Sequence, residues 1–518
     1  MFPVRSLAVA LAVGCVTSAG LHAQAAQREP FPGFDAYVRT ALTTWKVPGA
    51  SVAIVRNDSV IYAKGYGVRE VGKTTPVDER TIFAIGSSSK AFTSAAVAML
   101  VDSGKVSLDA PAAAYLPNFQ LYDPYASKEI TVRDLLSHRS GLARGELLWY
   151  GAEYDRDEIL RRVRWLQPSW SFRSRFGYQN IMYLAAGQIV ARAANTTWDD
   201  FIEQRIFQPL GMRESSTSVN ALEEMPNVAR PHAIVNDTVR AVPYRLIDNI
   251  APAGAINSNA VEMAQWVRLH LNDGKFDGKQ IISKRMVDEM RTPQIVIPGG
   301  GGGNQNPSAH LTAYGLGWFL SDYEGRLLVQ HGGNIDGMTA LVGMLPEEKF
   351  GIVILSNMNG STLPSAILLR AVDHQLERPL KDWSAQMRAR ADSAQARARA
   401  AQAGQQARVP NTKPSLPLSE YVGTYVDSLY GTAKVTEENG KLHFAFGPTW
   451  RGPLEHWHFD TFRMRLDTPV LPPAPVHFRL NPAGKVEDVQ VDLAGLVTFR
   501  KVPERPARPA ATTSGSPR

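Results

Sequence analysis

The stretch "GASVAIVRNDSVIYAKGYG", residues 49–67, predicts two β-strands joined by a turn at residues 56–58. The stretch "TALVGMLPEEKFGIVILSN", residues 339–357, repeats this pattern around a turn at residues 346–348. Segments with helical periodicity lie between the two hairpins, such as residues 87–104, 131–138 and 179–194. We therefore expect an α/β (α+β) fold in which one antiparallel sheet, built from both ends of this segment, is flanked by helices.

The chain of 518 residues is too long for a single compact core. Ala, Arg and Gln dominate residues 384–417, whereas residues 418–503 consist of short alternating strand patterns separated by turn signals. We expect a first domain at residues 30–383, followed by a linker that is either a solvated helix or disordered. A small C-terminal antiparallel β-barrel should come next, and residues 504–518 should form a disordered tail.

The N-terminus has the features of an export signal. Arg5 precedes the apolar run "LAVALAVGCV", and Ala23-Gln24-Ala25 supplies small residues for cleavage. We therefore expect a signal peptide at residues 1–25 and an exported protein, periplasmic or extracellular. Cys15 is the only cysteine and lies within the apolar run, so a lipid anchor at Cys15 is the alternative. Cleavage after Ala25 would leave a mature chain without disulfides or thiol nucleophiles.

The positive charge of the chain does not indicate nucleic-acid binding. The formal net charge is +7, but residues 384–413 carry +5 and residues 504–518 carry +2, so the remainder is close to neutral. A basic linker and a basic tail are typical solvated segments, and we expect no nucleic-acid partner. His456 and His458 lack acidic or thiolate companions, so we expect no metal site and no cofactor.

Ser87 and Lys90 form an S-x-x-K pair at the start of an apolar helical segment. If the helix begins near Ser87, both side chains share one face and Lys90 Nζ can reach Ser87 Oγ. A serine becomes a good nucleophile when an adjacent base takes its proton, and a desolvated lysine can be that base. The alternative is a helix-capping serine followed by a surface lysine, because S-x-x-K alone is common.

Two further motifs follow in the chain. Tyr178 and Asn180 form a Y-x-N triplet just before a helix, and a phenol whose pKa is lowered by a nearby cation can shuttle protons. His331, Gly332 and Gly333 end an apolar strand, where glycines allow a substrate to approach the strand edge. Each motif alone has an ordinary structural interpretation. The ordered set S-x-x-K, Y-x-N, H-x-G is far less expected by chance.

Over about residues 30–375 the chain resembles the serine β-lactamase and penicillin-binding protein superfamily. More narrowly, it resembles the class C-like serine hydrolases that include esterases and D-amino-acid-specific peptidases. Residues 130–142, 252–266 and 314–319 support this resemblance. The segment after residue 418 resembles the small lipocalin-like β-barrel that often follows this domain. The resemblance implies a β-lactamase-like fold and acyl transfer to serine without a cofactor.

The resemblance also implies a role for each motif residue. Ser87 would be the acylated nucleophile, Lys90 its base or electrostatic partner, and Tyr178 the general acid/base. Asn180 would position the substrate amide or Lys90, and His331 would lie beside the tyrosine. Gly333 would let the substrate approach the strand edge. The backbone N–H groups of Ser87 and Asn334 would form the oxyanion hole.

The third motif departs from the β-lactamase pattern. Those enzymes usually carry Lys-Thr-Gly or Lys-Ser-Gly where this chain has His331-Gly332-Gly333, and that lysine and hydroxyl hold the substrate carboxylate. Histidine is uncharged for much of the neutral range, which argues against efficient β-lactam turnover. The H-x-G form is familiar in the esterase and peptidase members.

We therefore expect an exported serine hydrolase that acts on D-amino-acid peptides, small esters or amides, with β-lactams as a further class. One alternative is a slowly acylated sensor of β-lactams or cell-wall fragments. Another is a true class C-like β-lactamase. The barrel is expected to serve as a lid, a docking module or a surface for homo-oligomerisation. Trp149 and Tyr150, in a predicted loop, would line either the core or the substrate cleft.

Overall fold

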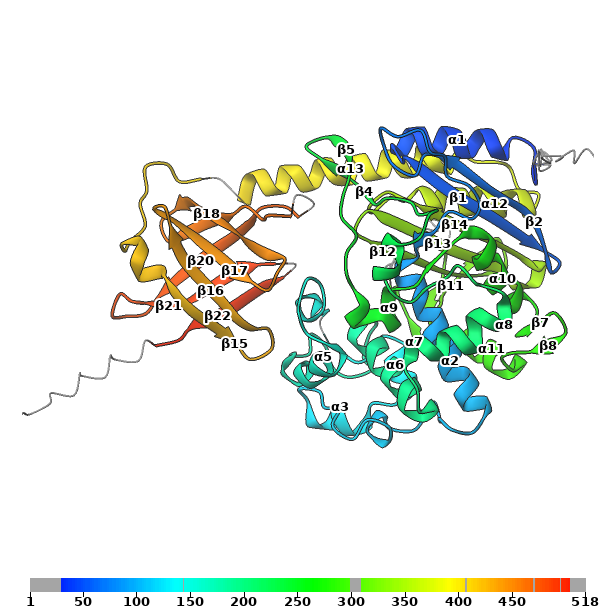
Figure 1. Ribbon diagram of the computed structural model, residues 1–518, viewed down its shortest axis with the longest axis horizontal. Coiled ribbons are helices and arrows are strands. Elements are labelled where there is room, and N and C mark those ends of the chain that lie inside the picture. The colour runs from blue at the N-terminus through cyan, green and yellow to red at the C-terminus, as the bar shows by residue number, and fades with distance from the viewer. Residues whose placement is uncertain are drawn as a thin grey trace, which may run out of the picture.

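The computed structural model describes residues 29–142, 144–298, 309–405, 408–468, 471–493 and 495–503. The expected signal peptide, Cys15 and the expected tail at residues 504–518 lie outside these ranges. The described chain forms a large mixed domain and a separate barrel, and the helix α13 (Trp383–Gln405) runs from the first toward the second (Figure 1).

The large domain is built on one eight-stranded antiparallel sheet. Its strand order is β2-β1-β14-β13-β12-β11-β10-β9, so the two predicted hairpins meet where β1 pairs with β14. This confirms the prediction that strands from both ends of the first domain form one sheet. The strands are β1 (Gly49–Arg56), β2 (Ser59–Gly67), β9 (Ile295–Val296), β10 (Thr312–Tyr314), β11 (Phe319–Tyr323), β12 (Arg326–Ile335), β13 (Met338–Leu345) and β14 (Phe350–Ser356).

Helices cover both faces of this sheet, as predicted. In β1, Val52 and Ile54 pack into one core and Ala53 and Val55 into the other, because successive side chains of a strand point to opposite faces. Burial on both faces explains why the central strands are almost continuously apolar. The first face is covered by α1 (Phe34–Trp45), α12 (Leu363–Gln375) and the first turn of α13. The second is covered by a larger group that includes α2 (Ser89–Asp102), α6 (Asn180–Ala194), α9 (Ala251–Gly254) and α10 (Ala260–Leu271).

Helix α2 lies at the centre of the second group and is buried on nearly every side. The ring of Phe92 stacks on Trp266 at a centroid distance of 3.9 Å. Thr93 Oγ1 donates to the carbonyl of Pro252 at 2.7 Å and accepts from Trp198 Nε1 at 3.0 Å. A helix held this way presents its N-terminus at a fixed place, and Ser87 lies just before that terminus.

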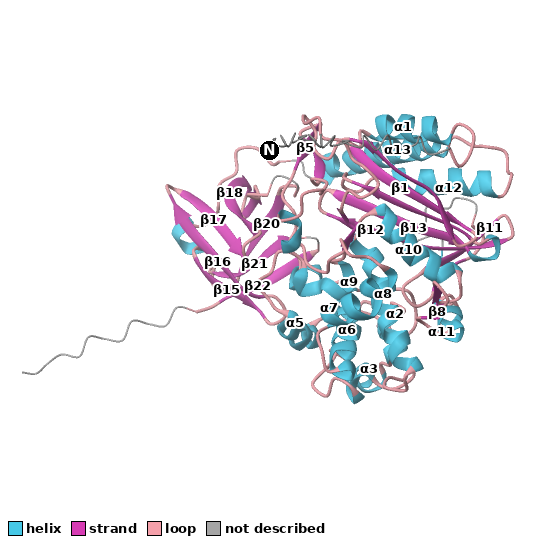
Figure 2. Cartoon of the chain, turned by 45° about the vertical axis from the view of Figure 1, so that its right-hand side comes forward, coloured by secondary structure: helices cyan, strands magenta, loops and turns pink. Residues whose placement is uncertain are grey.

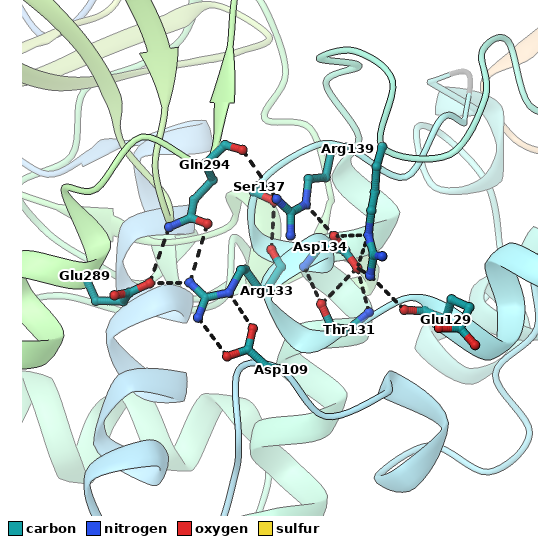
Figure 3. A network of polar contacts seen from close by, with 10 residues as sticks. Asp109, Glu129, Thr131, Arg133, Asp134, Ser137, Arg139, Glu289 and Gln294 are labelled. Atoms are coloured by element: carbon teal, nitrogen blue, oxygen red, sulfur yellow. Dashed lines mark hydrogen bonds and ion pairs between the residues drawn. The ribbon is translucent and has the colours of Figure 1, made fainter.

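A polar network braces the segment that leads to the second motif. Asp134 is completely buried, and its carboxylate binds the guanidinium groups of Arg139 and Arg173 (Figure 3). Arg133, which lies in the same helix as Asp134, forms ion pairs with Asp109 and Glu289. These contacts tie α4 (Val132–Leu136) to α11 (Lys284–Met290) and to the loop before Tyr178.

The remaining elements are short and connect these layers. They are α3 (Pro124–Glu129), α5 (Arg156–Arg162), α7 (Trp198–Ile202), α8 (Gln208–Leu210) and the two-stranded pairs β3 (Phe83–Ala84) with β6 (Asn257–Ser258), β4 (His232–Val235) with β5 (Thr238–Ala241), and β7 (Lys275–Phe276) with β8 (Lys279–Gln280).

The C-terminal segment is a closed antiparallel barrel of eight strands, which confirms the predicted barrel (Figure 2). Consecutive strands pair, and closure comes from the pairing of β15 with β22. Its interior is filled with aromatic and branched side chains, including Phe444, Phe478 and Phe499. The strands are β15 (Gly423–Asp427), β16 (Gly431–Glu438), β17 (Lys441–Phe446), β18 (Trp450–His458), β19 (Thr461–Met464), β20 (Ala474–Leu480), β21 (Val486–Asp492) and β22 (Leu496–Lys501).

The predicted linker begins as a helix. The buried residues of α13 are Trp383, Ser384 and Met387 at its start. Ser384 Oγ accepts from Trp45 Nε1 at 3.1 Å, and Trp383 Nε1 donates to Asp373 at 2.7 Å. Residues 392–401 are almost entirely exposed. Among the described helices, none is both long enough and apolar enough to cross a membrane.

Candidate active site

Ser87 lies in a tight turn at the entrance of α2. Residues Gly86–Ser88 form a 3₁₀ turn, and the helix itself begins at Ser89. No serine side chain caps the helix, because Ser88 Oγ donates to the carbonyl of His331 at 3.1 Å and Ser89 Oγ to that of Gly86 at 2.7 Å. Ser87 Oγ instead lies 3.0 Å from Lys90 Nζ. The geometry favours the nucleophile–base interpretation over capping.

Lys90 is completely buried beside the serine. Its Nζ donates to the carbonyl of Ala253 at 2.7 Å and lies 4.8 Å from the ring centroid of Tyr178. Burial lowers the pKa of Lys90 well below its usual range; the charge of Glu146 opposes this shift and that of Arg144 adds to it. This shift favours the free amine, the form that can accept a proton.

Tyr178 lies on the other side of Ser87 and precedes α6. Its hydroxyl is hydrogen-bonded to Ser87, and burial raises its pKa above the usual range of a phenol. The net pKa is therefore raised and not lowered as expected: the cation Arg144 and the hydrogen bond to Ser87 do lower the pKa of Tyr178, but burial outweighs both. Tyr178 therefore keeps its proton and can donate it.

The residues 331–334 of β12 form the opposite wall. The pairing of β11 with β12 ends at Phe319 and Gln330, so the last part of β12 runs on beyond its neighbour. Gly333 of this strand and Gly86 of the turn allow the strand to approach Ser87 closely. A Cβ on Gly333 would lie 1.8 Å from the carbonyl oxygen of Ile85 and 2.9 Å from the backbone nitrogen of Ser87. A Cβ on Gly86 would lie 2.9 Å from the backbone nitrogen of Asn334.

His331 is buried and serves as a neutral hydrogen-bonding residue. Its Nδ1 lies 2.6 Å from the carbonyl oxygen of Gly332, which can only accept, so Nδ1 carries the proton. Its Nε2 then accepts from the hydroxyl of Tyr314 at 3.1 Å. Burial, together with the neighbouring Lys90, lowers the pKa of His331 to about 3. An uncharged imidazole cannot replace the missing lysine as a charge for a substrate carboxylate.

The side chain of Asn180 is hydrogen-bonded to Glu146, a partner that the sequence did not indicate. Its Nδ2 donates to the carboxylate of Glu146 at 3.3 and 3.4 Å, and its buried Oδ1 has no hydrogen-bond partner among the described residues. Glu146 also accepts from Arg144 Nε at 2.6 Å. This charged pair was missed in the sequence, where the only signal is two opposite charges in the short segment "RGEL".

His138 packs against Tyr178 and does not line the cleft. Its Nδ1 accepts from the backbone N–H of Gln179 at 3.0 Å, and its carbonyl accepts from that of Gly177 at 2.8 Å. The two rings of His138 and Tyr178 lie 4.3 Å apart. His138 therefore positions the phenol.

These residues surround a cavity of about 480 Å³. Ser87, Tyr178 and residues 331–334 line one part of it, and residues 339–341 and 360–365 supply much of the rest. Phe319 adds an apolar surface and Arg144 a charged one. The space is large enough for a small peptide or ester beside the serine.

The barrel docks against the loop that follows Arg144. Trp450 Nε1 donates to the carbonyl of Tyr150 at 3.1 Å, and the Tyr150 hydroxyl donates to Asp336, in the turn after β12, at 2.6 Å. Trp149 is buried in the domain core, which confirms the core alternative for this residue, whereas Tyr150 lies between that core and the barrel. Arg245 binds both Asp336 and Thr449 of the barrel.

Comparison with known proteins gives two family matches. A model described as Beta-lactamase matches residues 34–377, and one described as a domain of unknown function (DUF3471) matches residues 407–503.

Two named relatives are similar over much of their length. The unguisins hydrolase ungD of Aspergillus violaceofuscus is 26% identical over 447 residues, which cover 79% of this chain and 77% of that protein. The protein flp of Staphylococcus aureus is 24% identical over 344 residues, 64% of each chain.

Solved structures share the fold. The octameric penicillin-binding protein homologue from Pyrococcus abyssi aligns with a TM-score of 0.60 at 23% identity, covering 90% of this chain and 99% of that chain. The structure of SurE with D-Leu aligns with a TM-score of 0.53 at 20% identity, covering 91% and 99%.

Proposed function

The chain belongs to the β-lactamase family of hydrolases, and from that premise we propose that it is a serine hydrolase that forms an acyl-enzyme on Ser87. The observation that carries the proposal is the contact of Ser87 Oγ with the buried amine of Lys90 at 3.0 Å, beside a protonated Tyr178. The hydrolase named among the relatives supports the reaction class.

In the first half of the reaction, Ser87 Oγ attacks the substrate carbonyl carbon while its proton passes to Lys90 Nζ. The oxyanion accepts hydrogen bonds from the backbone N–H groups of Ser87 and Asn334, where one such donor stabilises the transition state by about 2.7–4 kcal/mol. The bond to the leaving nitrogen or oxygen then breaks. Tyr178 gives its proton to that atom and recovers one from Lys90, so the serine proton ends on the leaving group.

Water completes the reaction in the reverse sense. It attacks the acyl carbon and gives one proton to the Lys90–Tyr178 pair, which returns it to Ser87 Oγ as the ester bond breaks. The products are a carboxylic acid and an amine or alcohol.

The proposed substrates are amides and esters, with D-amino-acid peptides and small esters ahead of β-lactams. The uncharged His331 and the side-chain-free Gly332 stand where β-lactamases place a lysine and a hydroxyl, which supports this order. We also propose export, on the apolar run and the small residues before Gln27.

The test combines intact-mass analysis with turnover of a chromogenic cephalosporin, a p-nitrophenyl ester and a D-Ala-D-Ala peptide. Ser87→Ala is compared with Ser103→Ala, at the far end of α2. Turnover that is lost only in Ser87→Ala supports the proposal. A lasting Ser87 adduct without turnover supports the sensor alternative, and efficient cephalosporin hydrolysis supports a β-lactamase. Wild-type turnover by Ser87→Ala contradicts the assignment.

We further propose self-association through the barrel, supported by the octameric homologue. Light scattering of the full chain should give a mass above that of one 56.8 kDa chain. A monomer at micromolar concentration contradicts it.

A further inference from the structure

Arg144 supplies the only charged side chain on the cavity beside Ser87 among the described residues. Its side chain is 60% exposed, so it reaches into the solvent-filled part of the cleft. The guanidinium carbon lies 5.2 Å from the ring centroid of Tyr178. A cation is therefore held directly beside the proposed proton donor.

The guanidinium of Arg144 is held in place by one hydrogen-bonded partner but has donors that remain unused. Its Nε donates to Glu146 at 2.6 Å, and within the described chain its two terminal nitrogens make no hydrogen bond. Glu146 is only 15% exposed and also accepts from Asn180, so it is an anchor set behind the arginine and not part of the cavity wall. Because Arg144 lines the cleft, these terminal N–H groups are available to a ligand there, in the fork that matches a carboxylate.

The other cationic groups nearby are already used. Lys90 is completely buried and is hydrogen-bonded to Ser87 and to the carbonyl of Ala253. Arg245 binds Asp336 and Thr449. His331 is a neutral donor to Gly332. Arg144 is thus the group that can compensate for a substrate charge in this cleft.

We propose that Arg144 binds a carboxylate on the leaving-group side of the substrate. The side follows from the reaction proposed above, on which this inference rests: Tyr178 protonates the leaving atom, so a group beside its ring meets the fragment that departs. The substrate class is then an amide or ester whose released amine or alcohol carries a carboxylate, such as a peptide with a free C-terminus. Arg144, in the loop before α5, would thus hold the substrate carboxylate in place of the lysine that β-lactamases carry in their third motif.

The experiment measures kcat/KM for two matched pairs of probes. One pair is the phenylacetyl ester of 3-hydroxybenzoate and that of 3-hydroxybenzamide. The other is N-acetyl-D-Ala-D-Ala and its C-terminal amide. In each pair the acyl group is the same and only the charge of the leaving fragment differs. The full chain is compared with Arg144→Gln, Arg144→Lys and the control Arg205→Gln. Arg205 also lies over a ring, that of Phe201, but is not among the residues that line the cleft.

We expect the full chain to favour the carboxylate probe of a pair by about 10- to 100-fold, the scale of a charged hydrogen bond. Arg144→Gln should bring the ratio within a pair close to one, Arg144→Lys should keep part of it, and Arg205→Gln should keep all of it. The preference should weaken at high salt, because the site is partly exposed.

Equal rates within each pair for the unmodified protein, or a preference that survives Arg144→Gln, would overturn the inference while leaving the Ser87 mechanism intact. An equal loss on both members of a pair would also overturn it, because a merely structural arginine would act that way. Failure to hydrolyse any probe, without a Ser87 adduct, would overturn the proposed function itself.

Discussion

At the scale of single residues, burial shifts the pKa values of Lys90 and Tyr178 so that the uncharged form of each is favoured. A lysine that must accept a proton is inactive when it is protonated, so its lowered pKa extends the availability of the base to lower pH. A tyrosine with a raised pKa remains a proton donor into the alkaline range. Together they give the serine a base and an acid over the same interval of pH.

This pair predicts the pH dependence of the reaction. kcat/KM should fall as the pH drops below the lowered pKa of Lys90, and it should stay level through pH 9, because the pKa of Tyr178 lies above its usual range. The measurement is kcat/KM for a neutral ester between pH 5 and 10. A rate that climbs with a midpoint near the ordinary lysine pKa of 10.5 would contradict it.

Lys90 should also lower the stability of the protein. Because the pKa of Lys90 is lower in the folded chain than in the unfolded chain, the folded chain binds less proton at this residue, so Lys90 favours unfolding until the pH approaches 10.5. We expect Lys90→Met to abolish turnover and to raise the free energy of unfolding at pH 7 by about 0.5–2 kcal/mol. The gain should shrink as the pH rises. Chemical denaturation at pH 7 and pH 9.5 measures the gain in unfolding free energy and its change with pH. A gain that grows as the pH rises would contradict the prediction.

At the scale of elements, the cleft depends on how closely β12 approaches the turn before α2. The approach is set by backbone atoms, because Gly86 has φ +51° and a side chain on Gly333 would overlap the carbonyl of Ile85. Ser88 fixes the same contact with its hydrogen bond to His331. The relative position of the two proposed oxyanion donors therefore follows from this close backbone contact. Asn334 Oδ1 holds the same part of β12 by accepting from the backbone N–H of Gly360 at 2.7 Å and from Thr339 Oγ1 at 3.1 Å.

Gly333→Ala tests this contact. The new Cβ should push β12 away from Ser87 and lower kcat by about 10²–10³-fold, the effect of losing one oxyanion donor. Gly332→Ala is the matched control, because its Cβ would meet nothing closer than 3.4 Å, and it should lose far less activity. Circular dichroism would verify folding of both variants. Equal losses would show that the spacing of β12 and the turn is not what matters.

At the scale of the whole molecule, the barrel is fastened close to the active site. Besides Trp450 and Thr449, the carbonyls of Tyr430 and Leu429 accept hydrogen bonds from Tyr154 at 2.7 Å and from Arg162 at 3.0 Å. Both views place α5 next to the barrel (Figures 1 and 2). Through Tyr150 and Asp336, these contacts connect the barrel to the turn that follows Asn334.

Trp450→Ala should loosen this attachment. Removing a buried tryptophan destabilises by about 3–5 kcal/mol, and here the loss falls on the contact with Tyr150 as well as on the barrel core. We expect faster tryptic cleavage in the exposed, arginine-containing part of α13 and a lower kcat/KM. Trp457→Ala, on a part of the barrel that meets Arg408 and Arg463, is the control. Unchanged cleavage and activity in Trp450→Ala would contradict a positioning role for the barrel.

Much of this architecture could be predicted from local patterns. The hairpins at residues 49–67 and 339–357, the helices between them and the short strands after residue 418 all have periodicities that are visible along the chain. The contact of Ser87 with Lys90 was predictable for the same reason, since residues three apart share a helical face. The expected domain boundaries and the roles of the motif residues stay predictions.

By itself, the sequence determined the fold class, the barrel and the set of motif residues, because each depends on spacing within a short segment. Only the tertiary structure decided that the pKa of Tyr178 rises, that Asn180 pairs with Glu146, that Arg144 faces the cleft and that the barrel meets Tyr150. These properties depend on burial and on contacts between residues far apart in the chain. Neither can be computed from periodicity, because the same residue can be exposed or desolvated according to what the fold packs against it.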